Sequence, residues 1–212
     1  MRTSEFIAAL AADPVPEPIR LGRRVAAALA LGFIGSLAIY ALFLGPRPDI
    51  ASAVQTVRFN LKFVDAFAFA LPTLLLMLRL GRPDAKLRAL VIWLVAPLIL
   101  LGGAAIVELL VVPQSEWLVR LVGTHAKFCV RMIPTLSAPL LVALIISMRP
   151  GAPMHPAWTG ALAGAASAGV AALLYASLCP DDSPLFVATW YPLATLICAG
   201  VGALAGQRFL TW

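Results

Sequence analysis

The sequence predicts an all-α membrane protein, a six-transmembrane-helix bundle with both termini cytoplasmic. Hydrophobic residues make up 61% of the 212 residues and charged residues only 12%, whereas soluble domains carry about 25% charged residues. Mean hydropathy is +0.94. The longest apolar stretches are each close to the roughly 20 residues that cross a bilayer. A soluble globular domain, a disordered chain and a nucleic-acid binder with a broad basic face are therefore excluded.

The spans follow from stretches that lack charge. Five long stretches contain no Asp, Glu, Lys or Arg, and a sixth, shorter one extends outward through Phe63 and Lys62. We expect spans at 25–44, 63–79, 89–111, 132–148, 157–178 and 185–206. The motifs at Gly160-xxx-Gly164 and Gly202-xxx-Gly206 place small residues one turn apart, which predicts close packing of the last two spans.

Positive charge predicts the orientation. With the N-terminus inside, Lys and Arg divide ten to six in favour of the cytoplasmic segments. The run Arg20-Leu-Gly-Arg23-Arg24 directly before the first span is the strongest signal. We therefore expect a multi-pass membrane protein with the N-terminus and the C-terminus in the cytoplasm.

Residues 1–24 are expected to form a cytoplasmic tail. A short helix is predicted over 3–12, and prolines then impose an extended linker. The apolar edge of this helix consists of Phe6, Ile7 and Leu10, and Asp13 ends it. Ten residues do not hold a helix alone in water. The tail therefore either lies on the membrane surface or folds on a partner.

A second non-spanning segment, about 114–131, reads as a periplasmic interfacial helix. Its polar residues recur at steps of four, four, three and four, which places them on one helical face: Glu116, Arg120, Thr124, Lys127 and Arg131. Apolar residues run down an adjoining stripe. The pattern is typical of an amphipathic helix lying in the outer membrane interface.

Two of the three cysteines are expected at the outer membrane face. Cys129 lies on the 114–131 segment, and Cys179 lies in the tight loop between the last two spans. Cys198 lies within the last span and reads as a packing residue. For the outer pair, packing and chemistry both remain open, because a bridge requires Cα atoms within about 7 Å.

Neighbouring charges separate the two outer thiols. Lys127, Arg131 and His125 would favour a thiolate at Cys129, whereas the two aspartates after Cys179 would disfavour one there. Cys129 is then the attacking thiol and Cys179 the resolving one. Capture of a soft metal ion such as copper is the alternative chemistry. Its ligands would be Cys129, Cys179 and His125.

No catalytic signature is present. The sequence contains no HExxH, GxSxG or phosphate-binding loop. Its acids near the spans, Asp65 and Glu108, fall toward the outer ends. We therefore expect no enzyme activity and no resident cofactor, apart from a transient soft metal ion as a signal. A small-solute carrier or channel remains an alternative, and a structural membrane subunit is a third.

The C-terminal half carries a family resemblance. The segments that carry it are Phe128-Cys129, Ile133-Pro134-Thr-Leu-Ser137-Ala-Pro139, Met148-Arg149-Pro-Gly151-Ala-Pro153, Tyr175-Ala-Ser-Leu-Cys179-Pro-Asp-Asp182-Ser183-Pro184 and Gly206-Gln-Arg208-Phe-Leu-Thr-Trp212. Together they resemble the NrsF family, the negative regulators of sigma F. The resemblance covers nearly the whole chain and is most specific over 128–212.

The resemblance implies a multi-pass anti-sigma factor of the bacterial inner membrane that sequesters an extracytoplasmic-function sigma factor. It also implies that Cys129 and Cys179 mediate a response to oxidant or heavy-metal stress. Under this hypothesis the sigma-binding residues are Phe6, Ile7, Leu10 and Asp13. The expected partners are the sigma factor and the lipid bilayer, with no direct contact to nucleic acid. A second protomer of a homodimer could add contact area.

Overall fold

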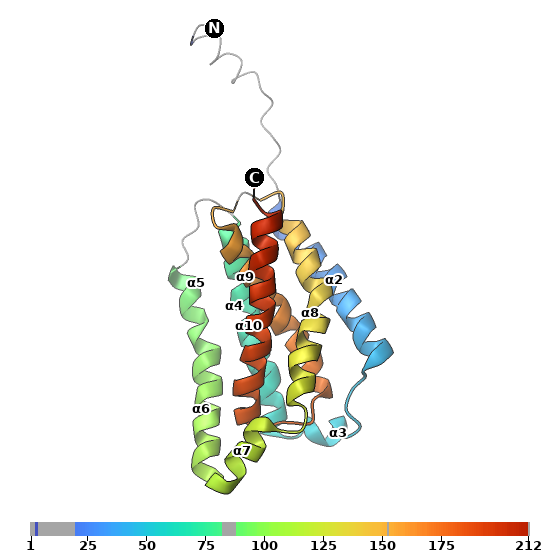
Figure 1. The fold of residues 1–212 in the computed structure, drawn as a ribbon, viewed down its shortest axis with the longest axis vertical. Helices are drawn as coiled ribbons and strands as arrows, with labels where there is room; N and C mark the ends of the chain where they lie inside the picture. Colours follow the sequence, from blue (N-terminus) through green and yellow to red (C-terminus); the bar gives the residue numbers. More distant parts are fainter. Residues whose placement is uncertain (1–2, 4–19, 82–87, 152, 212) are drawn as a thin grey trace.

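The computed structural model describes residues 3, 20–81, 88–151 and 153–211. These residues form long helices joined by short connections (Figure 1). The helices are α2 (Leu21–Phe43), α3 (Ile50–Ala53), α4 (Val57–Leu80), α5 (Arg88–Trp93), α6 (Val95–Val111), α7 (Gln114–Val122), α8 (Ala126–Met148), α9 (Pro156–Leu178) and α10 (Pro184–Phe209). Among these residues, six helical segments are long and apolar enough to cross a membrane, which confirms the predicted all-α architecture with six candidate spans.

The two ends of the bundle differ in what they hold. At the upper end in Figure 1, α2 begins and α10 ends, and Leu21 and Leu210 pack in one apolar cluster there. We call this the terminal end. Cys129, in the first turn of α8, and Cys179, directly after α9, lie at the opposite end, which we call the thiol end. Which end faces the cytoplasm stays a prediction, and the tail residues Phe6, Ile7, Leu10 and Asp13 lie outside the described residues.

Two helix boundaries differ from the sequence prediction. The helix expected over 114–131 divides, because Gly123 takes the left-handed conformation (φ +58°) and ends α7 at Val122. The following span therefore begins at Ala126 rather than at 132. Cys129 consequently belongs to the spanning helix itself and not to a separate interfacial helix.

The second span is also longer than predicted. It begins at Val57 rather than at 63, because the hydroxyl oxygen of Thr56 accepts a hydrogen bond from the backbone N–H of Phe59 (3.3 Å) and caps the helix. This extra turn and a half carries Arg58 and Lys62 as helical residues, so that their side chains reach the loops of the thiol end.

Helix α9 lies at the centre of the bundle and packs against α4, α8 and α10. Its contact with α10 depends on glycine: a Cβ atom on Gly160 would overlap the carbonyl oxygen of Gly202, and one on Gly164 would overlap that of Cys198. The predicted small-residue packing of the last two spans is therefore confirmed. By contrast, α6 lies at the edge of the bundle, against α4 and α10 (Figure 1).

Helix α8 connects the two ends of the bundle. It runs from Cys129 at the thiol end to Met148, a distance of about 30 Å at 1.5 Å per residue. The Met148 side chain is fully buried in the same apolar cluster as Leu21, the first residue of α2. Both side chains pack over Gly81 at the end of α4. A movement of α8 would therefore reach the base of the N-terminal tail.

Candidate functional site

The structure brings the two predicted sensor thiols into one buried cluster. Cys129 and Cys179 each have no exposed surface, belong to the same apolar core and are not bridged. They are close enough to influence each other electrostatically. The sequence analysis left open whether the pair meets, and the fold places both residues in one buried cluster at the thiol end of the bundle.

A tyrosine completes this cluster. Tyr175 precedes Cys179 by one helical turn, is fully buried and belongs to the same core cluster as both cysteines. Its ring contacts Phe128 on one side (6.3 Å between centroids) and Tyr191 on the other (5.9 Å). Within the described part of the chain, the hydroxyl makes no hydrogen bond of good geometry. It is therefore available to bond to a thiolate on either cysteine.

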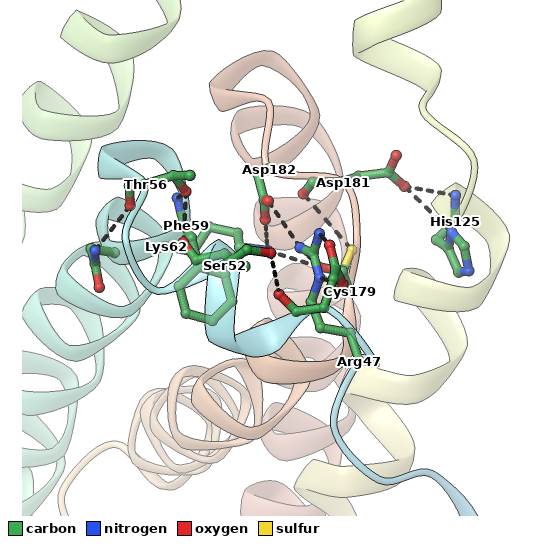
Figure 2. Close-up of polar contacts among 12 residues, drawn as sticks. Arg47, Ser52, Thr56, Phe59, Lys62, His125, Cys179, Asp181 and Asp182 are labelled. Atoms are coloured by element: carbon green, nitrogen blue, oxygen red, sulfur yellow. Dashed lines mark hydrogen bonds and ion pairs between the residues drawn. The ribbon is translucent and has the colours of Figure 1, made fainter.

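Beside Cys179, two cations from other parts of the chain, Lys62 and Arg47, hold the 179–183 loop (Figure 2). Lys62, a buried residue of α4, donates a hydrogen bond to the carbonyl oxygen of Cys179 (3.0 Å) and forms an ion pair with Asp182 (2.6 Å). Arg47, from the α2–α3 connection, also donates to Asp182 (2.9 Å). Hydrogen bonding to Asp49 raises the pKa of Arg47, and Asp182 acts in the same direction. The cation is thus fixed in its charged form.

Asp181, the residue before Asp182 in this loop, holds the start of α8. The Asp181 carboxylate accepts hydrogen bonds from the backbone N–H groups of Thr124 (3.1 Å) and His125 (2.8 Å), directly before the first turn of α8. The Thr124 hydroxyl donates to the same carboxylate (3.1 Å). A negative charge at this position also interacts favourably with the positive end of the helix dipole.

The end of the loop is held by α6. Glu108, which is almost fully buried, accepts hydrogen bonds from the Ser183 hydroxyl (2.6 Å) and from the backbone N–H of Leu185 in the first turn of α10 (3.1 Å). Arg120 of α7 donates to its other oxygen (3.2 Å). The 179–183 loop, which itself carries Cys179, is thereby connected to α4, α6 and the start of α8, the helix that carries Cys129.

The predicted asymmetry between the thiols is corrected. Lys127 and Arg131 are exposed, and residues two positions from Cys129 lie on the opposite side of the helix. They do not face its thiol. The cation near the pair is Lys62 instead: burial raises the pKa of the Cys179 thiol, while Lys62 and the Tyr175 hydroxyl act in the opposite direction. No basis remains for choosing Cys129 as the attacking thiol.

His125 does not join the two thiols. It is the residue before α8, its ring nitrogen lies 2.8 Å from the Thr124 hydroxyl, and its ring packs edge-on against Phe128. Among the described residues, no group of three or more His, Cys, Asp or Glu side chains is arranged to hold a metal ion. Soft-metal capture would therefore rely on the two cysteines.

The sequence analysis did not identify Lys62, Arg47 or Tyr175 as residues of the site. We counted Lys62 and Arg47 only as topology charges, and Tyr175 only as part of a family segment. A lysine at the edge of an apolar span is a recognisable signal, because ionisable residues at membrane depth are usually paired and functional. Its partner could not be identified without the fold, since Asp182 lies 120 residues further along the chain.

Fold and site together define a class: a six-span helical membrane protein with a buried thiol pair beneath a charged loop. Residues 10–212 match the family model NrsF, described as negative regulator of sigma F. The chain therefore belongs to the NrsF family. The probable anti-sigma-F factor NrsF of Azospira oryzae is 32% identical over 213 residues, and the anti-sigma-F factor NrsF of Caulobacter vibrioides is 30% identical over 221 residues. Each comparison covers 100% of both chains. No solved structure matches this chain.

Proposed function

We propose that this protein is an inner-membrane anti-sigma factor that binds a sigma factor of the extracytoplasmic-function class and releases it when its thiol pair is modified. Family membership supports the regulatory class. The observation that carries the sensing step is the burial of two unbridged thiols, Cys129 and Cys179, in one cluster. The proposed orientation places the thiol end in the periplasm and the terminal end in the cytoplasm.

Two kinds of thiol chemistry fit the pair. In the first, an oxidant removes two electrons, both thiols lose their protons and one S–S bond forms. In the second, a soft metal ion displaces the two protons and is held by two thiolates. Both reactions remove the same pair of S–H groups from an apolar core. Both would change the packing directly below the 179–183 loop.

The contacts of this loop suggest how the signal leaves the site. Because Asp181 holds the start of α8, a shift of Cys179 changes the position of both thiol-bearing helix ends together. Helix α8 then carries the displacement about 30 Å to Met148. Met148 packs with Leu21, which is the first residue of α2 and follows the tail. We infer that this path changes how the tail is presented to the sigma factor.

The tail supplies the proposed sigma-binding helix. Phe6, Ile7 and Leu10 would dock in an apolar groove of the sigma factor, and Asp13 would contact its polar rim. A ten-residue helix is only about 15 Å long, which is small beside a typical interface of about 800 Å² per partner. The 79–88 segment, or a second protomer, would therefore add contact area.

The test is co-purification of the sigma factor with the full chain, together with transcript profiling of a strain that lacks the protein. Deletion should induce one sigma regulon constitutively. Leu10→Asp should release the sigma factor without lowering the amount of membrane protein, whereas Ala8→Asp, on the opposite side of the predicted helix, should retain it. Unchanged retention by Leu10→Asp would move the binding site away from the tail. A deletion that induces no regulon would favour a carrier or channel.

A further inference from the structure

A second site lies between α4, α6, α9 and α10, apart from the thiol cluster. A cavity of about 230 Å³ opens there, and its walls include Asp65, Leu98, Leu101, Gly169, Tyr191 and Thr195. Apart from the Asp65 carboxyl and the hydroxyl groups of Thr195 and Tyr191, the side chains of these walls are apolar. The volume is below the roughly 300–1,000 Å³ of pockets that take drug-sized ligands. The cavity therefore fits a small molecule with a single ring or a short chain.

Asp65 is the polar group that gives this cavity its chemistry. The residue is only 9% exposed, and its Oδ1 has no hydrogen-bond partner in the described part of the chain. The nearest cation along the helix is Lys62, one turn away, which is engaged by Asp182 and by the Cys179 carbonyl. A buried carboxyl group without a partner is costly, so a ligand that supplies one would bind favourably.

The cavity is reached from the lipid side of the bundle. Leu98 and Leu196 both line it and are each 68% exposed on the outer surface of the helices. Their exposed surfaces lie on spans that face the hydrocarbon region in the proposed membrane arrangement. A ligand that enters here must first partition into the bilayer, so its body has to be apolar.

We propose that this cavity binds a small, membrane-soluble amine, with the amine head on Asp65 and the apolar body against Leu101 and the Tyr191 ring. In the complex the amine head is an ammonium ion that donates hydrogen bonds to the Asp65 carboxylate. The pair stays neutral as a whole. Charge-assisted hydrogen bonds of this kind are about twice as strong as neutral ones, and the Thr195 hydroxyl offers a further acceptor.

Other ligands fit less well. A bare Ca²⁺ ion takes about six to eight oxygen ligands, whereas the side chains of the cavity walls offer one carboxyl group and two hydroxyl groups. A neutral alcohol or carbonyl compound could bond to the carboxyl group but would gain only an ordinary hydrogen bond. The amine is thus the ligand class for which an unpartnered carboxyl in an apolar cavity is most selective.

The test uses the full-length protein in lipid nanodiscs, titrated calorimetrically with 2-phenylethylamine, with empty nanodiscs subtracted. The matched neutral probe is 2-phenylethanol. Asp65→Asn keeps the shape of the side chain and a hydrogen-bonding group but cannot form the ion pair. It should weaken amine binding at least tenfold and change alcohol binding less than twofold. Glu116→Gln, which removes an exposed carboxyl on α7, should leave amine binding unchanged.

Equal amine binding by the Asp65→Asn variant would overturn the proposal, as would alcohol binding as tight as amine binding in the parent. If Asp65→Asn does not assemble, Leu98→Trp provides the second test. This lipid-facing substitution retains the carboxyl group and narrows the mouth of the cavity. It should weaken amine binding at least tenfold, and unchanged binding would place the amine elsewhere. None of these measurements depends on a sigma factor.

Discussion

The Asp181 carboxylate accepts a hydrogen bond of 2.8 Å from the backbone N–H of His125. Asp181 lies two residues after Cys179, and His125 lies four residues before Cys129. This bond therefore joins the chain segments that carry the two thiols, outside the apolar core that buries them. It also places a negative charge at the start of α8. The two thiols are thus held together by a polar contact that does not involve sulfur.

The first prediction concerns this contact. Asp181→Ala should lower the free energy of unfolding by about 1–2 kcal/mol, the usual cost of losing a side chain that bonds to the N–H groups of a helix start. Asp181→Asn should cost less, because the amide oxygen still accepts hydrogen bonds. Thermal unfolding of the purified variants in one detergent measures both. Glu116→Ala is the control, since Glu116 is an exposed residue of α7 that pairs with Arg120 at the surface, and exposed pairs contribute at most about 1 kcal/mol.

The second prediction concerns Lys62 and Asp182. Lys62→Met keeps the apolar stem but removes the buried charge, leaving Asp182 with Arg47 alone. The protein should lose about 1–3 kcal/mol, the cost of an unsatisfied buried polar group. Combining Lys62→Met with Asp182→Asn should cost less than the sum of the two single changes, because the partners are then removed together. Strict additivity in this double-mutant cycle would mean that the pair contributes nothing.

The third prediction concerns the contact between α9 and α10. A Cβ on Gly202 would overlap the carbonyl oxygen of Gly160, whereas one on Gly200, half a turn earlier, would meet no atom within 4 Å. Gly202→Ala should therefore destabilise the bundle by about 1–3 kcal/mol, as overpacking does. Gly200→Ala should be neutral or slightly stabilising. Thermal unfolding of the two variants compares them directly, and equal effects would show that the helices are not in close contact.

The predictable part of this fold depends on composition and spacing. Long uncharged stretches predict membrane spans because a helix is one of the few structures that can cross a bilayer. The glycine motifs predict helix contact because only small residues fit between closely packed backbones. The exact ends of the helices were harder to predict from the sequence. The break at Gly123 depends on a left-handed backbone conformation, and glycine adopts many conformations in other contexts.

Of the residues in the candidate site, only the two cysteines could be predicted from the sequence. Cys129 and Cys179 stand out because both fall at span ends on the same side. The effects of charge on the two thiols were assigned to residues that are close in the sequence. Lys127 and Arg131 were therefore wrongly expected to face the Cys129 thiol. Neighbours at two positions point away from each other on a helix, whereas Lys62 reaches the loop from another helix. Electrostatic partners across a fold have no sequence signature of their own.

The fourth prediction concerns the pH dependence of Cys179, measured in a Cys129→Ser background. Burial raises the pKa of this thiol above its ordinary value, and only the thiolate reacts with iodoacetamide. Its alkylation rate should therefore still rise with pH beyond about 8.5, where the rate of an unfolded cysteine levels off.

Lys62 opposes the burial effect, so Lys62→Met should raise the pKa of Cys179 further and slow its alkylation at every pH below that pKa. Mass spectrometry gives the rates, with the denatured protein as reference. Faster alkylation in the Lys62→Met variant would contradict this electrostatic role, unless the variant has unfolded.

The fifth prediction concerns signalling by the thiol pair. Because both thiols are equally buried and share one cluster, disulfide formation and two-coordinate metal capture each require both of them. Cys129→Ser and Cys179→Ser should therefore each abolish induction of the sigma regulon by oxidant or soft metal, while basal repression persists. Cys198→Ser is the matched control: its thiol is buried on α10 beside Ser137 (3.2 Å), so induction should be unchanged.

Full reversal of a 1:99 equilibrium needs about 5.5 kcal/mol of differential free energy, so a partial shift is expected from one bond or one metal ion. A transcriptional reporter measures the response, and induction of the Cys129→Ser, Cys179→Ser double variant at the parental level would refute thiol sensing.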